Sequence, residues 1–202
     1  MKLNERTMLI GETISFVPYC KHHVEKYHLW MQDKDLQFLT ASEPLTLSEE
    51  YEMQLSWQTD DDKLTFLAIQ GNTIPLTIEE EISRMIGDIN LLFLFSPEIA
   101  EINMMVAEHK FRRSGYGSEM LQLMLCFAAE NLSMKKFSAK ISNSNQPSML
   151  FFQKHNFQLE SVSEVFQETN FELLVSDVSQ CSYKKVDYPF YLSMEPTDKQ
   201  GL

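Results

Sequence analysis

The feature that most constrains this chain is a basic, glycine-containing loop between a predicted strand and a predicted helix. Residues 101–107 (EINMMVA) are predicted to form a β-strand, and residues 115–132 carry apolar side chains at helical spacing. Gly115 and Gly117 lie where the helix begins, after two consecutive arginines. Because the first turn of a helix has free N–H groups and a partial positive charge, it attracts phosphate. The segment therefore predicts either a phosphate-binding loop or a basic turn that only caps the helix.

Two common phosphate-binding motifs do not fit this loop. The P-loop pattern GxxxxGK[ST] requires a lysine at a fixed offset, and none follows Gly117 there. The dinucleotide pattern GxGxxG requires a third glycine at the position of Met120. What remains is Arg112-x-x-Gly115-x-Gly117, which on its own leaves both interpretations open.

The basic loop stands out because the chain as a whole is acidic. Its 202 residues include 17 Lys and Arg against 29 Asp and Glu, a formal net charge of −12. This balance argues against general binding to nucleic acid or to an anionic membrane. It is compatible with a basic partner or a cationic substrate, although acidity that serves only solubility is the more common case.

Cysteine and histidine give no prediction of a metal site. The chain has an odd number of cysteines and no CxxC, so neither a disulfide framework nor a zinc site is indicated. His22, His23 and His28 could imitate a metal cluster, but adjacent histidines point to different faces of a helix, and no metal is expected. The start of the chain lacks a signal-peptide pattern, and no apolar run approaches the roughly 20 residues of a membrane span. A cytoplasmic location is expected, with the nucleus as the alternative.

The order of predicted elements indicates a single α/β domain. Strands are predicted at 13–19, 64–70, 85–95, 101–107, 136–141, 157–162 and 166–175, and helices at 20–31, 46–58, 115–132 and 147–155. Thr46 and Glu49 form a predicted capping box, whereas residues 71–84 are expected to be a polar loop. This order predicts one sheet covered by helices on both faces, in a domain of residues 1–176. Residues 177–202 have no clear periodicity and are expected to form a mobile extension.

Two blocks of sequence resemble a known superfamily. The loop Arg112-x-x-Gly115-x-Gly117, between a strand and a helix, resembles the coenzyme A pyrophosphate loop of the GNAT N-acetyltransferases. The stretch from Asn145 to Phe157 (NQPSMLFFQKHNF) is similar to a second block of the same superfamily, N-x-x-[AS]-x-x-x-[YF]-x-K-x-G-F. The resemblance implies the GNAT α/β fold, with a central mixed, twisted sheet of about six to seven strands.

A narrower resemblance covers about residues 1–175. The segments HLWM (28–31), TASEPLTL (40–47), EYEMQLSW (50–57), GDINL (87–91) and VFQE (165–168) resemble the N-acetyltransferase 9 group, which is related to ribosomal-protein alanine acetyltransferases. This resemblance implies acetyl-CoA as donor and an amine as acceptor, without a metal. Relatives of this group have been linked to microtubules, so tubulin is an expected partner by resemblance only.

The resemblance also implies a set of cofactor-binding residues. Backbone groups of Met105 and Val106 would pair with the pantetheine arm and polarise the thioester carbonyl, and the amides of the loop would hold the pyrophosphate. Asn145 would hydrogen-bond the arm. The full expected set is Met105, Val106, Arg112, Arg113, Ser114, Gly115, Tyr116, Gly117, Ser118, Asn145, Ser148, Phe152 and Lys154.

The resemblance also points to candidate catalytic groups. Glu101 occupies the place of a glutamate that several lysine-acetylating relatives use, which makes it the candidate general base, whereas a surface position at the start of its strand is the alternative. Asp88 is a weaker candidate. Many relatives place a tyrosine acid where this chain has Phe152, which cannot donate a proton to the leaving thiolate. The expected acceptor groove involves Thr40, Ser42, Glu43 and Val165.

Two hypotheses follow from these residues. The first is an acetyl-CoA-dependent N-acetyltransferase that acts on an amine of a protein, either an N-terminal α-amine or a lysine. The second is a catalytically weak or inactive module that keeps the acetyl-CoA fold and binds a partner such as a microtubule. The intact loop and Glu101 favour the first hypothesis, and Phe152 favours the second.

Overall fold

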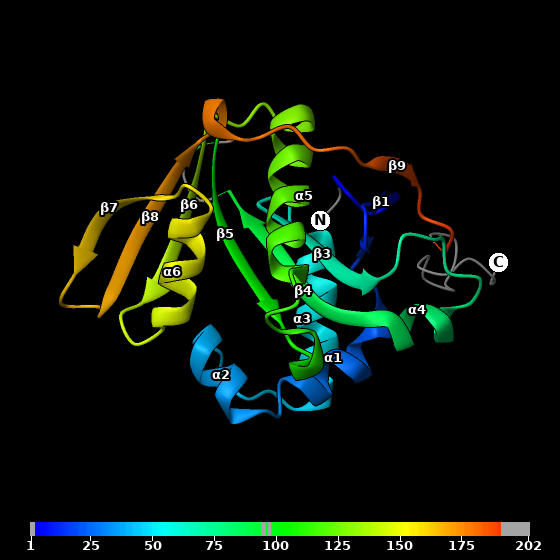
Figure 1. Ribbon diagram of the computed structural model, residues 1–202. Coiled ribbons are helices and arrows are strands. Elements are labelled where there is room, and N and C mark those ends of the chain that lie inside the picture. The colour runs from blue at the N-terminus through cyan, green and yellow to red at the C-terminus, as the bar shows by residue number, and fades with distance from the viewer. Residues whose placement is uncertain (1–2, 94–95, 97, 191–202) are drawn as a thin grey trace.

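The computed structural model describes residues 3–93, 96 and 98–190. Its strands form one nine-stranded sheet, which helices flank (Figure 1). The strands are β1 (Thr7–Ile10), β2 (Ile14–Pro18), β3 (Lys63–Gln70), β4 (Met85–Leu92), β5 (Ile99–Val106), β6 (Lys136–Ser142), β7 (Gln158–Ser163), β8 (Glu168–Leu174) and β9 (Lys184–Asp187). Their spatial order is β7-β8-β6-β5-β4-β3-β2-β1-β9. Neighbouring strands are antiparallel except β5 and β6, which are parallel.

The helices lie between the strands in the order that the sequence predicts, with two additions. They are α1 (Val24–Trp30), α2 (Lys34–Thr40), α3 (Leu47–Thr59), α4 (Ile78–Arg84), α5 (Tyr116–Asn131) and α6 (Gln146–Lys154), with short 3₁₀ turns η1 (Lys21–His23), η2 (His109–Phe111) and η3 (Val175–Asp177). The capping box at α3 is confirmed, because Thr46 N donates to Glu49 Oε2 at 2.8 Å and Glu49 N donates to Thr46 Oγ1 at 3.4 Å. In the described part of the chain, the helices are too short or too polar to cross a membrane.

Helices cover both faces of the sheet, which confirms the predicted α/β architecture (Figure 1). On one face, α5 and α6 pack against strand residues such as Phe66 and Phe137. On the other face, α1 packs through Tyr27 against Leu67 and its neighbours, with α3 beside it. The chain therefore has one apolar core on each side of the sheet, as side chains alternate along each strand.

The structure corrects the sequence prediction at four short elements. The sheet has nine strands instead of six to seven, because β1 and the last strand, β9, extend one edge. α2 was not predicted, and α4 lies in the stretch 71–84 that was expected to be a loop. Thr77 caps α4, accepting a hydrogen bond from Glu80 N at 3.1 Å. Elements of four to seven residues span too few repeats for hydrophobic periodicity to reveal them.

The segment after residue 177 is part of the domain as far as the structure describes it. β9 pairs with β1 along its whole length, and the side chain of Tyr188 is buried. Cys181 lies against Cys126 of α5 as a disulfide pair, with Cα atoms 6.3 Å apart, a pairing that the cysteine count did not indicate. The expectation of a mobile extension is therefore wrong for residues 184–188, whereas residues 191–202 lie outside the described residues.

Candidate active site

The sheet opens between β5 and β6. These strands pair only from Ile99 opposite Lys136 to Glu101 opposite Ser138, whereas β6 stays paired with β8 as far as Ser142. Figure 1 shows the two strands diverging toward the end of β5 where α5 begins. The backbone of β5 beyond Glu101 thus faces the opening without a strand partner on that side in the described chain. Such an edge can pair with an extended ligand in the manner of an added strand.

The glycine-containing loop lies at the wide end of this opening. Gly115 is the N-cap of α5 and has φ +91°, a left-handed conformation that favours glycine, and open space surrounds the position of a Cβ there. The N–H groups of the first turn of α5 have no partner within the helix. Arg113 and Ser114 are exposed beside them, with Arg113 at φ +59°. A bulky anion can therefore reach both the helix N-terminus and a guanidinium.

The two arginines of the loop have different surroundings. Arg112 turns back onto β5, where its Nε donates to Val106 O at 2.9 Å and its Nη2 donates to Ala107 O at 3.3 Å. These bonds hold the loop against the end of the strand. Arg113 is the one of the pair whose side chain is exposed. Both arginines belong to the predicted cofactor-binding set, but in this structure only the side chain of Arg113 is exposed at the loop, whereas that of Arg112 binds backbone carbonyls of β5 and its end.

The remaining loop residues connect α5 to its neighbours. The Tyr116 hydroxyl accepts a hydrogen bond from Gln70 Nε2 at 3.1 Å, which directs the phenol toward β3. Ser118 Oγ lies 3.0 Å from His155 Nε2, just after α6. A Cβ at Gly117 would meet Val106 and the Phe151 ring at ordinary van der Waals distance, so its lack of a side chain is not sterically required there. Sequence patterns did not single out His155. Burial lowers the pKa of this histidine.

The second sequence block, Asn145 to Phe157, contains α6 and forms the side of the opening opposite β5, here called its second lip. Asn145 is the N-cap of α6, with Oδ1 accepting from Ser148 N at 3.2 Å and Nδ2 donating to Leu39 O of α2 at 3.3 Å. In this structure its amide thus binds protein groups, whereas the pattern predicted the pantetheine arm. Lys154 is exposed, and Asn156, which stands where the superfamily block has glycine, has φ +66°.

Phe152 is part of the core. Its side chain is 4% exposed, and its ring packs edge-on against those of Phe151 and Phe157, with centroids 5.4 and 5.0 Å away. This environment offers no hydroxyl at the place where related enzymes carry a tyrosine. The sequence predicts no proton donor at this position, and the two neighbouring rings, Phe151 and Phe157, are phenylalanines as well.

A polar face lies on the side of the sheet that α1 and α3 cover. Three rows cross β3, β4 and β5 in register: Lys63, Leu92 and Glu101; Thr65, Asn90 and Asn103; and Leu67, Asp88 and Met105. Because residues two apart along a strand share a face, both candidate bases point to the same side. Asn90 Nδ2 donates to Asp88 Oδ2 at 2.8 Å, and Asn103 Nδ2 donates to Glu101 Oε1 at 3.2 Å.

The two candidate bases differ in burial. The Glu101 side chain is 13% exposed, so it lies neither in the core nor on the open surface, and Lys140 Nζ approaches its Oε2 at 3.6 Å. Asp88 is 3% exposed, and burial raises its pKa to about 6, although the hydrogen bond from Asn90 opposes the shift. Asp88 lies directly opposite Met105, whose backbone was expected to meet the thioester. Sequence patterns identified both carboxylates but not Lys140.

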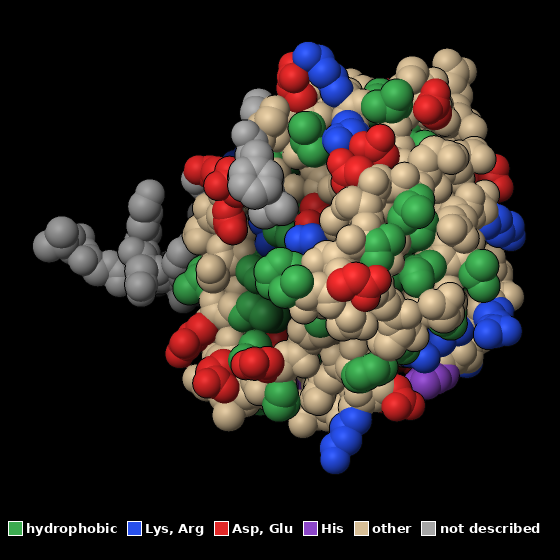
Figure 2. Space-filling model, turned by 90° about the vertical axis from the view of Figure 1, so that its left-hand side faces the viewer, with side chains coloured by type: hydrophobic (Ala, Val, Ile, Leu, Met, Phe, Trp, Pro, Cys, Tyr) green, Lys and Arg blue, Asp and Glu red, His purple; other side chains and the backbone are tan. Residues whose placement is uncertain are grey.

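The expected acceptor groove is divided between two segments. Thr40 ends α2 and its Oγ1 donates to Leu36 O at 2.8 Å, and Ser42 Oγ lies 2.9 Å from the same hydroxyl. Glu43 is exposed in the next turn, and Val165, at 87% exposure, belongs to the hairpin between β7 and β8. On the side of the molecule that carries β7, β8 and α6, acidic and hydrophobic side chains are interspersed (Figure 2).

α2 bridges the two lips of the opening. At its start, Asp33 Oδ2 lies 3.0 Å from His109 Nε2 in the loop after β5. At its end, Leu39 O accepts the hydrogen bond from the amide that caps α6. This helix, which sequence periodicity did not predict, thus connects the segment before the glycine-containing loop with the lip that α6 forms.

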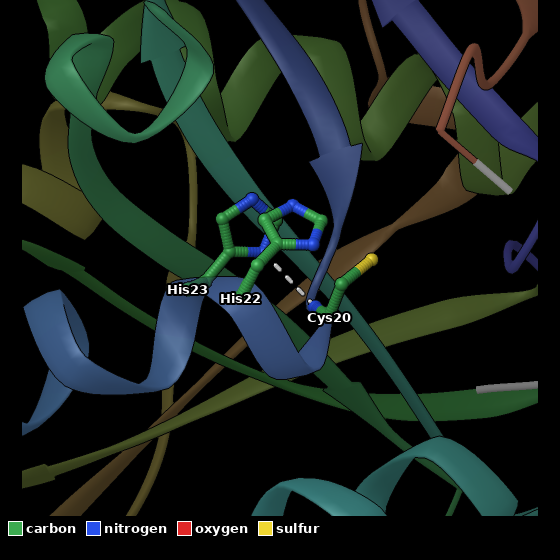
Figure 3. Close-up of side chains that lie close together, drawn as sticks. All are labelled: Cys20, His22 and His23. Carbon is green, nitrogen blue, oxygen red and sulfur yellow. Dashed lines mark hydrogen bonds between the residues drawn. The ribbon is translucent and has the colours of Figure 1, made fainter. Parts of the chain in front are cut away.

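A separate cluster contains metal-binding residue types. Cys20, His22 and His23 converge, with the two imidazole rings 4.0 Å apart (Figure 3). Both rings face Glu81 Oε1, at 3.0 and 2.7 Å, so the expectation that the adjacent histidines diverge is wrong. They converge because they lie in the tight 3₁₀ turn η1, and His28 instead approaches Glu50 at 3.8 Å.

Hydrogen bonds already occupy this cluster. His23 accepts from Cys20 N at its Nδ1 and faces Glu81 with its Nε2, and burial lowers its pKa to about 4. The Tyr188 hydroxyl also donates to Glu81, at 2.6 Å. Burial alone would raise the pKa of Glu81, but its bonds from the imidazoles and the phenol lower it to about 2. These bonds link α4 with the end of the described chain, and a metal ion at this position would have to replace some of them.

Comparison with known proteins identifies relatives across most of the chain. The family profile described as "Acetyltransferase (GNAT) domain" matches residues 14–158. The human "Alpha/beta-tubulin-N-acetyltransferase 9" is 45% identical over 184 residues, covering 88% of this chain and 87% of the human protein. The "N-acetyltransferase 9-like protein" of Nematostella vectensis is 40% identical over 192 residues, with coverages of 91% and 97%.

Solved structures share the fold at low sequence identity. Spermidine N-acetyltransferase from Vibrio cholerae, in complex with CoA and spermine, superimposes with a TM-score of 0.71 at 13% identity, over 82% of this chain and 98% of that one. A GNAT-family acetyltransferase from Bacillus anthracis gives a TM-score of 0.69 at 18% identity, over 84% and 99%. At these identities the likeness concerns the fold alone.

Proposed function

Because the chain belongs to the GNAT acetyltransferase family, we propose that it binds acetyl-CoA in the opening between β5 and β6 and transfers the acetyl group to an amine of tubulin. The observation that carries the proposal is the early end of the β5–β6 pairing, with the N-terminus of α5 at the wide end. A thin, extended donor with an anionic end matches both features. Tubulin is the proposed acceptor because the mouse and human relatives are named tubulin N-acetyltransferases. The proposed place of the reaction is the cytoplasm.

Residues of the chain would hold the donor in two ways. The first-turn N–H groups of α5 and the exposed Arg113 would bind its diphosphate, because both offer positive potential to the same anion. The free edge of β5 near Met105 and Val106 would pair with its amide-containing arm. A backbone N–H there would stabilise the negative charge that develops on the thioester oxygen as the amine attacks.

Glu101 is the proposed general base, and it would act through water, because it lies two rows of the sheet away from Met105. The acceptor reaches the site as an ammonium and must lose a proton before its nitrogen can bond to the acetyl carbon and the carbon–sulfur bond can break. Glu101 is partly buried on the polar face, and Asn103 and Lys140 hold its two oxygens. Asp88 is the second candidate, favoured by a pKa of about 6 and by its position opposite Met105.

The leaving thiolate would take its proton from water. Phe152 and the rings around it have no acidic proton to give. Catalysis in this chain would therefore lack the contribution of a protein acid, which is typically worth about 10²–10⁴ in rate. A slow transfer step is the expected consequence.

Acetyl-CoA titration followed by transfer assays tests this function. The wild-type chain should bind acetyl-CoA and place acetyl on purified tubulin, and Glu101→Gln should lower turnover about 100-fold while leaving the acetyl-CoA Kd within about twofold. Glu168→Gln, an alternative glutamate on β8, is the matched control. Absence of acetyl-CoA binding would reject the proposal. Binding of acetyl-CoA and tubulin without acetyl transfer would favour the second hypothesis, a non-catalytic module.

A further inference from the structure

Three aromatic rings meet where α1 and α3 pack on the sheet, on the same face as the candidate bases. Tyr19 follows β2, Tyr27 belongs to α1 and Trp57 to α3. The Tyr19 centroid lies 5.0 Å from that of Tyr27 and 6.0 Å from that of Trp57, and the other two are 6.5 Å apart. Both tyrosines are buried, whereas Trp57 is partly exposed. The rings therefore form a compact aromatic group with one side toward the surface.

Two buried oxygens in this region have no hydrogen-bond partner. They are the Tyr19 hydroxyl and Oε2 of Glu50, whose residues are 0% and 1% exposed. The other oxygen of Glu50 lies 3.8 Å from His28 Nδ1, which is longer than a hydrogen bond. A buried polar group that bonds to nothing is costly, so folded proteins rarely leave one unsatisfied. Each of these two oxygens can accept a hydrogen bond from outside the chain, either from water or from a ligand.

Two carboxylates, one lysine and one histidine surround the rings. Burial and then the negative charges of Glu50 and Asp88 raise the pKa of Tyr19, and burial, Asp88 and Glu50 act in the same direction on Tyr27. Both carboxylates therefore lie within electrostatic reach of both phenols. The cations that face the group are Lys63, with Nζ 3.0 Å from the Trp57 ring centroid, and His28 when it is protonated.

The group lies between the surface and the expected thioester position. Asp88 is directly opposite Met105 on β5, and the Tyr27 hydroxyl donates to Asp88 Oδ2 at 3.4 Å. Lys63 lies in the row of Glu101, two rows from Asp88, and its Nζ lies over the partly exposed ring of Trp57. An amine that passed over this rim would meet the aromatic faces first and the carboxylate beside Met105 last.

We propose that Tyr19, Tyr27, Trp57, Glu50 and Asp88 form the binding site for the primary ammonium group of the acceptor. The proposal deepens the function proposed above and depends on it. An ammonium ion satisfies every feature at once: aromatic faces attract it, Glu50 Oε2 accepts one of its protons, and Asp88 faces another. The unpartnered Tyr19 hydroxyl would accept a third hydrogen bond. A neutral hydroxyl compound has no charge for the carboxylates to bind and is excluded by the same chemistry.

Kinetics with tubulin provide the first test. Glu50→Gln keeps the side-chain size but removes the charge, and Tyr19→Phe removes only the unpartnered hydroxyl. We expect the KM for tubulin to rise about tenfold or more in Glu50→Gln and a few-fold in Tyr19→Phe, with the acetyl-CoA Kd within about twofold of wild type. Glu52→Gln, on the exposed side of α3, is the matched control and should leave both constants unchanged.

Binding of a small probe separates this inference from the proposed function. The wild-type chain, without acetyl-CoA, is titrated with n-propylammonium chloride and with 1-propanol while tryptophan fluorescence is recorded, since Trp57 lies in the group. Saturable quenching by the ammonium alone, lost in Glu50→Gln, supports the site even if tubulin is not the acceptor. If both variants keep the wild-type KM and n-propylammonium gives no saturable signal, the group is a water-filled part of the core and the inference is overturned.

Discussion

Replacement of Asp88 by asparagine separates the energetic cost of this carboxylate from its chemical use. Asp88 is 3% exposed, and burial raises its pKa from 3.8 to about 6. At about 1.4 kcal/mol per pKa unit, the folded chain disfavours the ionised form by about 3 kcal/mol. The fold thus keeps a carboxylate where an amide of equal size would avoid this cost.

The pH dependence of this cost has a definite sign. Because the pKa is higher in the folded chain than in the unfolded chain, the cost is absent below about pH 4 and complete above about pH 6. Asp88→Asn should therefore gain stability relative to wild type as the pH rises from 4 to 7. The net gain at pH 7 should be about 1–2 kcal/mol, because the new amide N–H group also needs a partner. Turnover should fall at the same pH, since the amide neither attracts an ammonium nor accepts a proton.

Urea unfolding of both proteins between pH 4 and 8 measures this difference, and steady-state acetyl transfer to tubulin measures turnover. Asp187→Asn, at an exposed position of β9, is the control and should change neither quantity. A stability difference that does not vary with pH would refute the electrostatic reasoning. Full turnover in Asp88→Asn would remove Asp88 from both the ammonium site and the list of candidate bases.

Three further predictions concern the donor site, the missing acid and the buried link at α4. Arg113→Glu should weaken acetyl-CoA binding about tenfold or more by calorimetry, whereas Lys184→Glu on β9 should not, and an unchanged Kd would contradict the loop assignment. Phe152→Tyr should raise kcat several-fold, because the new hydroxyl supplies a proton donor. The same variant should lower the free energy of unfolding by about 1–3 kcal/mol, because the hydroxyl enters an apolar site. An unchanged kcat would mean that this position does not face the thiolate. The pKa of Glu81 is lowered to about 2, so its contribution to stability is complete above about pH 4.5 and is lost as the pH falls toward 2. Glu81→Gln should therefore reduce the fall of the unfolding temperature between pH 4.5 and 2, whereas the exposed control Glu79→Gln should leave it unchanged.

Sequence patterns predicted the strand and the helix on the proposed donor side because these elements are local. The strand, loop and helix between Glu101 and Leu132 are consecutive, and hydrophobic spacing together with two glycines defines their order. The long helices α3 and α5 were predicted within one or two residues of their bounds, since caps and periodicity act over short distances. The exception within the loop is Arg112, whose bonds to β5 depend on how the chain turns back.

The proposed ammonium site could not be predicted in the same way, because tertiary register brings its residues together. Asp88 meets Met105, and Tyr19 meets Trp57, through strand pairing and helix packing between segments far apart in sequence. Single-residue patterns identified Asp88 but carried no information about its burial. The bond from Asn145 to α2 was missed for the same reason, since α2 itself is too short to give a periodic signal.

We propose that this chain moves an acetyl group from acetyl-CoA to an amine of tubulin with Glu101 as the base. The most direct test of this claim is mass spectrometry of purified tubulin after incubation with the chain and isotopically labelled acetyl-CoA. We predict labelled acetyl on a tubulin amine with the wild-type chain, and about 100-fold less with Glu101→Gln at equal acetyl-CoA occupancy. Unlabelled tubulin in the presence of chain that has bound acetyl-CoA would contradict the claim, as would equal labelling by both proteins.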